Sequence, residues 1–468
     1  MNKKTKIMAT IGPACESEEV LRRLIEQGVN VFRFNLKHNV FEWHKKIINR
    51  AKEIAKEMQV EIGVLVDFQG PEVRIETNNE VDIGLVEGES LFIADEFLVG
   101  KKIIKINPSV ATKKIKVGDV IYLNSGDLKL IVIKKNNKLI ELKSEGEAVV
   151  KNRKSMNLIS EDLDLPILAK RDMETLARLE QINPDYIALS FVRNQKDIQI
   201  LKSLLEKIND RVKVVAKIEN LSAIKNIEDI IKISDGIMIA RGDLGIEIPI
   251  KELAFWQKKI IDLCRKESKP VIVATQMLGS MVENTQPTRA EATDVSNAIF
   301  DGTDVLMLSE ETSIGNHPVK VVKEMSEIAS FCENIEEIRN ITIETKSATE
   351  VLVDAAVNII LNNKNLKIKA VVIFTESGKT ARIFSRYRLN LPIIAMTDKP
   401  GTVKGLIMSY GVEPYYKKFN ETNFRMPKSL VKNISNIVSL DSGDTLVVIH
   451  GNNWMKSEST SDISLVTV

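Results

Sequence analysis

The sequence predicts an α/β protein organised around a (β/α)8 TIM barrel, and three observations lead to this prediction. Short β-rich apolar segments alternate with amphipathic helical segments along the chain. The alternation gives eight strand–helix units, the number that closes this barrel. Charged residues follow two consecutive strand candidates, at Lys217-Ile218-Glu219 and at Arg241-Gly242-Asp243. In this fold the carboxyl ends of the strands meet at one rim, where functional side chains gather.

Each element follows from its local pattern. Continuous apolar runs bounded by polar residues predict buried strands, and apolar residues at helical spacing predict amphipathic helices between them. The predicted strands are 6–11, 30–35, 63–67, 186–191, 213–218, 236–240, 270–275 and 304–308. The predicted helices include 17–27, 41–58, 172–181, 196–208 and 251–267.

The alternation breaks once and then ends, which predicts two further domains. After the third strand the chain shows short alternating strands and turns, typical of a small β-barrel inserted at the rim, where it would act as a lid. Near the C-terminus a helix at 348–361 and strands at 370–374, 392–396 and 445–449 predict a three-layer α/β domain. The predicted division is barrel 1–71, lid 72–162, barrel 163–335 and C-terminal domain 345–468.

Composition excludes several classes of protein. The chain has 468 residues, 44% of them apolar, and a formal net charge of +2, so no strong field indicates nucleic acid or a membrane surface as partner. No apolar run approaches the roughly 18 residues that a membrane span needs, and no apolar signal region is present at the N-terminus. Cys15, Cys264 and Cys332 lack metal-binding spacing, as is typical of reduced thiols. We therefore expect a cytoplasmic protein.

The rim residues themselves indicate a kind of chemistry. Two carboxylates at one rim, Glu219 and Asp243, are suitable oxygen ligands for Mg²⁺, and Lys217 beside them is a cation for phosphate. The alternative is a salt bridge that closes adjacent strand ends. Other strands also end in polar groups, which favours a functional site over this alternative. These groups are Arg33, Asn35, Asp67, Ser190, Thr275 and Ser309.

At a series of motifs the chain resembles pyruvate kinase, over nearly its whole length. The order and spacing of these motifs carry the resemblance, because any one of them alone is unspecific. The resemblance implies phosphoryl transfer from phosphoenolpyruvate to ADP, giving pyruvate and ATP. The motifs are Thr10-Ile11-Gly12-Pro13, Arg33-Phe34-Asn35, Gly70-Pro71-Glu72-Val73-Arg74, Lys217-Ile218-Glu219-Asn220, Ala240-Arg241-Gly242-Asp243-Leu244-Gly245, Ala274-Thr275-Gln276-Met277, Pro287-Thr288-Arg289-Ala290-Glu291 and Thr375-Glu376-Ser377-Gly378-Lys379-Thr380.

The resemblance implies a role for each rim residue. Glu219 and Asp243 would hold Mg²⁺, and Lys217 would neutralise the transferring phosphoryl group. Arg33 would clamp phosphate oxygens, and the Gly242-Asp243 backbone would bind the substrate carboxylate. Thr275 would organise proton delivery to the enolate carbon. Ser309 and Glu311 match positions near that relay.

The resemblance also implies a nucleotide site and a homotetramer. The nucleotide side includes Asn35, His38, Arg74 on the hinge of the insertion, and Lys154 near its return, although a lysine in a flexible segment is often only solvated. No constellation surrounds the other histidines, which are expected to be structural. These are His44, His317 and His450.

The chain departs from the family pattern at its monovalent cation site. Asn35, Asp67 and Phe68 match ligand positions for potassium, but Lys37 replaces a ligating serine. A lysine ammonium would supply the same charge and crowd the ion, so we expect that potassium is not required. Glu72 favours the opposite expectation, that potassium is required, since in the family a glutamate at this position accompanies potassium dependence. Further departures are Asn39, Phe68-Gln69, Ile159-Ser160 and Glu310.

The last domain carries a candidate effector site. Thr375, Ser377, Gly378 and Thr380 would form a phosphate nest of hydroxyl and N–H groups, or else a plain turn between strand and helix. The run Gly378-Lys379-Thr380 is not a P-loop, because the first glycine of that motif is absent.

Two alternative functions remain at this point. A magnesium-dependent barrel lyase that acts on pyruvate or phosphoenolpyruvate would explain Glu219 and Asp243, but not Arg74, the lid or the C-terminal domain. A catalytically silent regulatory relative would be expected to lack Lys217 or its two carboxylate neighbours, and all three are present.

Overall fold

The structure, a computed structural model, describes most of the chain. The described residues are 3–136, 138–159, 165–335, 341–363, 365–418, 434, 437–451 and 460–468. Ser160 and the predicted boundary between residues 162 and 163 lie outside them. Within this part of the chain, no helix is both long and apolar enough to cross a membrane.

Eight parallel strands close into a barrel, which confirms the predicted fold class. The hydrogen-bonded order around the barrel is β1-β17-β16-β15-β14-β13-β3-β2. Every predicted strand is present, with ends that shift by no more than two residues. The strands are β1 (Lys6–Thr10), β2 (Val29–Asn35), β3 (Gly63–Asp67), β13 (Tyr186–Leu189), β14 (Lys213–Ile218), β15 (Gly236–Ala240), β16 (Val271–Ala274) and β17 (Val305–Leu308).

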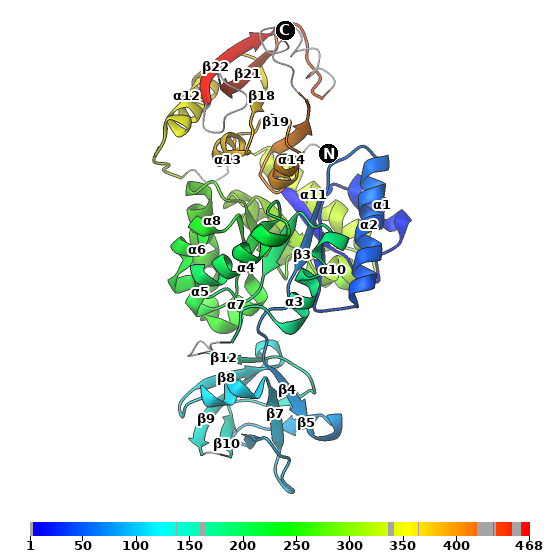
Figure 1. Cartoon of the computed structure of the whole chain (residues 1–468), viewed down its shortest axis with the longest axis vertical. Helices are drawn as coiled ribbons and strands as arrows, with labels where there is room; N and C mark the ends of the chain where they lie inside the picture. The colour runs from blue at the N-terminus through cyan, green and yellow to red at the C-terminus, as the bar shows by residue number, and fades with distance from the viewer. Residues whose placement is uncertain are drawn as a thin grey trace.

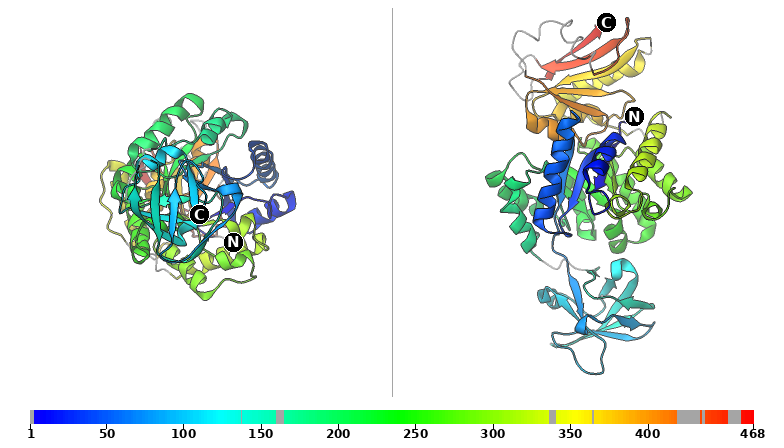
Figure 2. Two further views of the ribbon diagram at one scale, coloured as in Figure 1. Left: turned by 90° about the horizontal axis from the view of Figure 1, so that it is seen from below. Right: turned by 90° about the vertical axis from the view of Figure 1, so that its right-hand side faces the viewer.

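Helices surround the barrel and cover the outward side of its strands (Figures 1 and 2). α1 begins after Ser17, whose hydroxyl accepts a hydrogen bond from Val20 N at 3.3 Å, and α9 begins with a capping box of Thr288 and Glu291. The outer helices are α1 (Glu18–Glu26), α2 (Phe41–Glu57), α3 (Lys170–Leu176), α4 (Gln195–Ile208), α5 (Leu221–Lys225), α6 (Ile227–Ile233), α8 (Leu253–Lys266), α9 (Arg289–Phe300) and α11 (Pro318–Glu333).

Two of the differences between predicted and observed element ends have a clear local cause. The strand predicted to run to Thr275 ends at Ala274, because Thr275 and Gln276 both take positive φ angles and leave the strand. The helix predicted for 172–181 is α3 followed by a separate 3₁₀ turn, Leu179–Gln181, since Arg178 between them leaves the helical conformation with φ −120° and ψ 11°.

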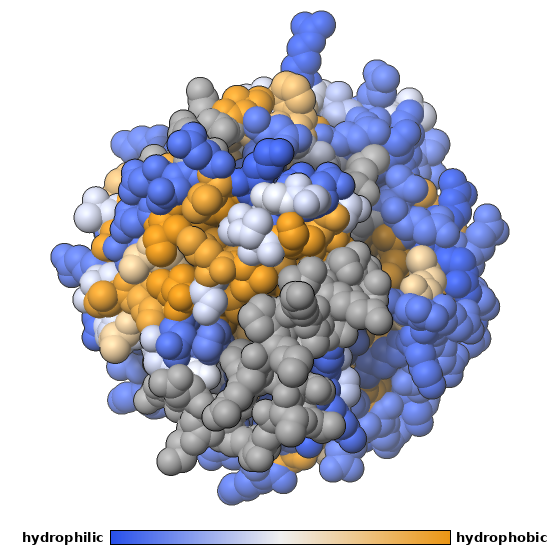
Figure 3. Space-filling model, turned by 90° about the horizontal axis from the view of Figure 1, so that it is seen from above, coloured by the Kyte–Doolittle hydropathy of each residue, from blue (hydrophilic) through white to orange (hydrophobic). Residues whose placement is uncertain are grey.

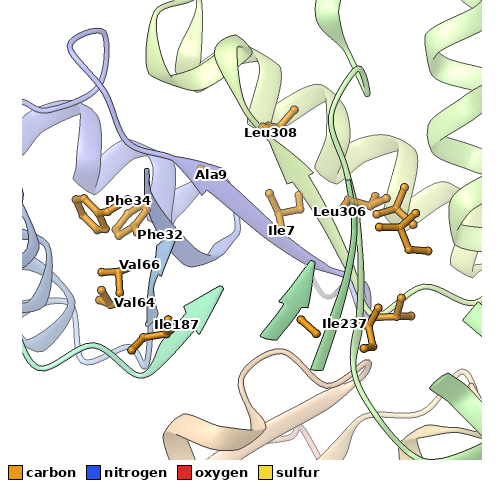
Figure 4. Close-up of a cluster of buried hydrophobic side chains, with 14 of the residues drawn as sticks. Ile7, Ala9, Phe32, Phe34, Val64, Val66, Ile187, Ile237, Leu306 and Leu308 are labelled. Carbon is orange, nitrogen blue, oxygen red and sulfur yellow. The ribbon is translucent and has the colours of Figure 1, made fainter. Parts of the chain in front are cut away.

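The barrel core has two apolar layers, because alternate residues of each strand point to opposite sides. One set packs between strands and helices; Figure 4 shows Ile7, Phe32, Phe34 and Val64 among them. The other set fills the interior and includes Met8, Val31, Leu65, Val215, Met238 and Met307. Since both sides of the strands are buried, the strand sequences are mostly apolar, and polar residues such as Arg33 and Lys217 lie toward the strand ends.

The inserted β domain lies at the carboxyl end of the strands, and the C-terminal domain lies at the opposite end (Figures 1 and 2). The insertion is a seven-stranded sheet with the order β12-β8-β9-β10-β6-β7-β4, and a bridge between Arg74 and Ser155 links its two edges. Its strands are β4 (Arg74–Thr77), β6 (Ser90–Ile93), β7 (Ile103–Asn107), β8 (Val120–Leu123), β9 (Leu128–Lys135), β10 (Ile140–Ser144) and β12 (Met156–Leu158), with β5 (Ile83–Leu85) and β11 (Ala148–Val150) as a separate pair.

The C-terminal domain has a five-stranded sheet with the order β20-β19-β18-β21-β22, of which the sequence predicted only three strands. α12, α13 and α14 pack on one face through Val357, Phe384 and Leu406. Ile434 lies on the other face, in a stretch that is mostly outside the described residues. The elements are α12 (Ala348–Asn362), β18 (Ile368–Phe374), α13 (Lys379–Ser385), β19 (Ile393–Thr397), α14 (Pro400–Leu406), β20 (Val412–Tyr416), β21 (Thr445–Gly451) and β22 (Thr460–Thr467).

This domain closes the barrel at the end away from the rim. Ile407 and Met408, just after α14, join the interior cluster with Tyr186, whose hydroxyl donates to the Lys404 carbonyl. A buried ion pair also joins the two domains: Arg388 Nη2 lies 2.6 Å from Asp304 Oδ2, with side-chain exposures of 2% and 4%. Asp304 Oδ1 accepts from Tyr410 N at 2.9 Å, so this one carboxylate contacts two segments of the C-terminal domain.

Replacing Arg388 by methionine should destabilise the protein by about 3–5 kcal/mol, because Asp304 would stay buried without its charged partner. Urea unfolding followed by circular dichroism measures the loss. The control is Glu327→Ala, which removes an exposed helix pair with Lys323 at 3.7 Å and should change stability by about 0.5 kcal/mol or less. A loss below about 1 kcal/mol for Arg388→Met would show that the pair contributes little to domain docking.

Candidate active site

Four buried charged side chains meet at the carboxyl rim of the barrel. Lys217 Nζ lies 3.2 Å from Asp67 Oδ1 and 2.9 Å from Glu219 Oε1. Asp67 Oδ2 lies 2.7 Å from Arg33 Nη2. They meet because β2, β3 and β14 end at one rim and deliver their last polar side chains to it. The network contains two positive and two negative charges, which is how buried charges are tolerated.

Each member of the network has further polar partners. Arg33 Nη1 donates to Thr10 Oγ1 at 2.9 Å, since Arg33 and Thr10 are directly paired residues of β2 and β1. Lys217 Nζ donates to Ser190 Oγ at 2.8 Å, and Glu219 Oε2 accepts from Phe191 N at 2.6 Å. The side chains are therefore fixed in place before any ligand binds.

Burial and charge shift the pKa values of the network in defined directions. Burial opposes the charged form of Lys217, but Asp67 and Glu219 outweigh it and raise the pKa of the ammonium. Burial likewise opposes ionisation of Asp67, yet Lys217 and Arg33 lower its pKa below the usual range. Burial raises the pKa of Glu219, and the nearby charge of Asp243 adds to this despite the opposing effect of Lys217.

Glu219 and Asp243 are the residues that would hold a divalent metal ion. Asp243 lies in the first turn of α7 (Arg241–Glu247), which begins directly after β15, and both carboxylates line the same cavity. A cation there would offset the burial and mutual repulsion of the two carboxylates. The described residues contain no group of three or more His, Cys, Asp or Glu arranged for a metal. Two carboxylates nevertheless suit Mg²⁺, which takes its remaining ligands from water and substrate.

The cavity has a volume of about 310 Å³ and lies between the barrel rim and the base of the insertion, where the chain enters and leaves that domain. Its lining includes Arg33, Asn35, Lys37, Asp67, Phe68, Lys217, Glu219 and Asp243 from the barrel, and Ser155, Asn157 and Leu158 from the insertion. This volume is at the lower end of the range for small-molecule sites. The structure thus brings most of the predicted rim residues to one cavity.

Several predicted residues lie near the cavity but do not line it. Thr275 Oγ1 accepts from Gly242 N at 2.9 Å, so the backbone N–H that the resemblance assigns to the substrate carboxylate already has a partner. Lys154 and His38 are exposed. Partial desolvation of the otherwise exposed ring, together with the neighbouring cations Lys37 and Arg33, lowers the pKa of His38, so the neutral form dominates at pH 7.

Lys37 and Arg74 share one carboxylate. Lys37 Nζ lies 2.8 Å from Glu72 Oε1, and Arg74 Nη2 lies 2.9 Å from Glu72 Oε2. The Lys37 side chain is 34% exposed and that of Glu72 only 6%. Lys37 therefore neither extends into solvent nor pairs with Asp67. It ties the loop after β2 to the hinge that leads into the insertion.

The other predicted positions have structural partners. Glu311 is 2% exposed and accepts from Ser309 N at 2.6 Å and Leu278 N at 3.3 Å, so it joins two rim loops. In the C-terminal domain Thr375 Oγ1 accepts from Gly378 N at 3.0 Å, and Gly378 has a left-handed φ of +80° before α13. Of the remaining histidines, His44 is 2% exposed and its ring contacts the His38 carbonyl at 2.8 Å, as expected for a structural residue.

The sequence analysis missed Glu247, which also lines the cavity. Burial raises its pKa to about 7, although Asn157 of the insertion and the Leu221 backbone both donate to it. Its position four residues after Asp243 on the same helix was the available signal, because such residues share a helix face. Glu247 thus links α7 to the insertion.

Comparison with known proteins agrees with the fold and with the rim. Residues 2–322 match the family model "Pyruvate kinase, barrel domain", and residues 350–466 match "Pyruvate kinase, alpha/beta domain". A pyruvate kinase of Bacillus licheniformis is 38% identical over 96% of this chain and 78% of its own length, and one of Staphylococcus epidermidis is 37% identical over the same shares. A crystal structure of a pyruvate kinase from Cryptosporidium parvum matches 100% of this chain and 96% of its own, with 32% identity and a TM-score of 0.89.

These matches define a phosphotransferase with a barrel, an inserted domain and a C-terminal α/β domain. The chain belongs to the pyruvate kinase family. It transfers the phosphoryl group of phosphoenolpyruvate to ADP in glycolysis, giving pyruvate and ATP, and the lyase and the silent relative are set aside. A divalent metal ion is the general cofactor of this family.

Glu247→Gln should stabilise the protein at pH 8 and leave it unchanged at pH 4.5. Because the folded pKa of about 7 lies above the ordinary glutamate pKa of 4.5, the unfolded state releases its proton first as pH rises. Stability therefore falls between these two values, by about 1–3 kcal/mol, and glutamine removes this loss. Thermal unfolding at both pH values measures the difference. An equal effect at pH 4.5 and pH 8 would contradict the assigned titration.

Proposed function

We propose that phosphoenolpyruvate binds in the cavity beside Lys217 and that ADP enters from the side of the insertion. The observation that carries this proposal is the buried network of Arg33, Asp67, Lys217 and Glu219 at the rim. It fixes two cationic side chains, Arg33 and Lys217, at a site that also offers two carboxylates for a metal. Such preorganised charge is the main source of catalysis in phosphoryl transfer.

Lys217 and Arg33 would stabilise the phosphoryl group during transfer. The bond from phosphorus to the enolate oxygen breaks, a bond to the terminal phosphate oxygen of ADP forms, and charge spreads over the equatorial oxygens. The raised pKa of Lys217 keeps its ammonium protonated at neutral pH. The three contacts of Arg33 with Asp67 and Thr10 orient its guanidinium and use only part of its five donors.

Glu219 and Asp243 would bind Mg²⁺, which supplies positive charge for the substrate oxygens and the forming enolate. Thr275 would deliver a proton to the enolate carbon, with Gly242 N orienting its hydroxyl. On the nucleotide side, Arg74, Lys154, His38 and Asn35 would contact ADP. The insertion would act as a lid, because it supplies part of the cavity wall and would exclude water that competes for the phosphoryl group.

Self-association into a homotetramer and a cytoplasmic location are part of the same proposal. Seen from the end with the C-terminal domain, apolar side chains gather on one side of the face (Figure 3). Val351 and Leu361 of α12 are 56% and 52% exposed, and Leu465 of β22 is 47% exposed. β22 pairs only with β21 among the described strands, so it leaves a sheet edge for a partner. The location follows from the glycolytic activity.

Lys217→Met should reduce turnover by at least about a hundredfold, ~2.7 kcal/mol, and leave phosphoenolpyruvate binding largely intact, because the charge matters most during transfer.

Asp243→Ala should instead abolish magnesium-dependent binding of phosphoenolpyruvate. A coupled assay for ATP formation and calorimetry with Mg²⁺ measure the two effects.

Lys196→Met is the matched control, since Lys196 is exposed at the start of α4, outside the cavity lining. It should change turnover by less than about twofold. If Lys217→Met loses less than about a hundredfold in turnover, Lys217 has a structural role. If Asp243→Ala still binds phosphoenolpyruvate normally in the presence of Mg²⁺, the metal site is refuted.

We also propose that Lys37 replaces the monovalent cation, so that the enzyme works without potassium. Glu72 carries one negative charge between the cations Lys37 and Arg74, so the group retains one net positive charge beside the cavity. Two of the remaining candidate ligands for potassium already accept hydrogen bonds within the protein. Asn35 Oδ1 accepts from Lys37 N at 3.1 Å, and the Phe68 carbonyl accepts from Ser190 Oγ at 2.7 Å.

The initial rate in tetramethylammonium buffer should therefore change little when potassium chloride is added at constant ionic strength. Lys37→Ser should lose activity in that buffer and regain part of it with potassium, while Lys37→Arg, which keeps the charge, should stay independent. Activation of the unmodified enzyme by about tenfold or more, ~1.4 kcal/mol, would contradict the proposal.

A further inference from the structure

The turn that carries Thr275 has an unfavourable backbone conformation. Directly after β16, Thr275 has φ +70° and Gln276 has φ +53°. Two consecutive non-glycine residues lie in the left-handed region, and a β-branched residue there is a genuine outlier. Such conformations persist only where the surrounding structure holds them, and they cluster at functional sites.

Arg241 is the side chain that holds this turn. Its Nη2 donates to the carbonyls of Thr275 at 2.7 Å and Gln276 at 3.3 Å, the two residues with positive φ. Arg241 is 7% exposed. Its other terminal nitrogen, Nη1, contacts both carboxylate oxygens of Asp294, at 2.9 and 2.8 Å. Gln257 Oε1 accepts from the same nitrogen at 3.3 Å.

The division of these contacts argues against a purely structural salt bridge between α7 and α9. A pair with Asp294 requires only Nη1, whereas Nη2 is directed at the Thr275 turn. Arg241 is also the first residue of α7, next to Gly242, whose N–H donates to the Thr275 hydroxyl. The same short segment therefore holds both the backbone and the hydroxyl of Thr275.

We propose that Arg241 is a positioning residue that keeps the Thr275-Gln276 turn left-handed and so aims the Thr275 hydroxyl for proton transfer. This rests on the proposed role of Thr275. In that step the π electron pair of the enolate takes a proton at the methylene carbon, and the enolate oxygen becomes the ketone oxygen of pyruvate. Thr275 passes on the proton, which water replaces. Without the guanidinium the turn relaxes and protonation slows, whereas Lys217 and the metal ligands keep their places.

The test separates proton transfer from phosphoryl transfer. Exchange of the pyruvate methyl protons in D₂O with Mg²⁺, followed by ¹H NMR, reports the proton step in reverse. Arg241→Gln should slow this exchange by at least about tenfold, and the KM for phosphoenolpyruvate should change by less than about threefold. The thermal midpoint and steady-state turnover are measured on the same samples.

Rescue by glycine gives the sharper result. Glycine adopts positive φ without steric penalty, so Gln276→Gly should restore at least about a third of the exchange lost in Arg241→Gln. In the otherwise unmodified enzyme, Gln276→Gly should change the exchange rate by less than about twofold, since the turn is already left-handed there. A merely structural role of Arg241 would leave the defect unrescued.

Asp294→Asn is the second variant, for the case in which Arg241→Gln fails to fold. Asparagine keeps the shape of the side chain but removes the charge that holds the Arg241 guanidinium. This variant should slow exchange of the pyruvate methyl protons by about threefold or more. Exchange within about twofold of normal in folded Arg241→Gln or Asp294→Asn, or no rescue by Gln276→Gly, would overturn the inference. An unmodified enzyme that forms no ATP would instead refute the proposed function.

Discussion

The site depends on the burial of one ammonium group, Lys217 Nζ, between the carboxylates of Asp67 and Glu219. A lone buried charge is destabilising by several kcal/mol, so these side chains can share an apolar rim only if the strand ends bring them together. Closure of the barrel does this, because β3 and β14 flank β13 and end at the same rim. Ile407 and Met408 fill the opposite end, which keeps the interior closed beneath the network.

The inserted domain is connected to this network through charged and polar contacts. Glu72, on the hinge, contacts Lys37 of the barrel and Arg74 of the insertion. Glu247 accepts from Asn157 of the insertion one helical turn after Asp243. Two carboxylates that line the cavity therefore also contact the insertion or its hinge. A movement of the insertion relative to the barrel would therefore change the surroundings of both carboxylates.

Local sequence patterns predicted the barrel, whereas the features that depend on long-range contacts were not predicted. Continuous apolar runs located the eight barrel strands, and the strand ends located Lys217, Glu219 and Asp67. β20 and β22 were missed because both are partly exposed and their apolar pattern is weak. Three further features depend on residues far away in the chain, so no local pattern reveals them. They are the left-handed turn at Thr275, the ion pair of Lys37 with Glu72, and the hydrogen bond from Gly242 N to the Thr275 hydroxyl.

The most direct test is a crystal structure with Mn²⁺ and phosphoenolpyruvate in the absence of nucleotide, because Mn²⁺ prefers the same oxygen ligands as Mg²⁺ and scatters anomalously. We expect one anomalous peak coordinated by Glu219 and Asp243. We also expect Lys217 Nζ to leave Glu219, now 2.9 Å away, for a phosphoryl oxygen of the substrate. A metal ion bound elsewhere, or Lys217 still paired with Glu219 and away from the substrate, would contradict the account.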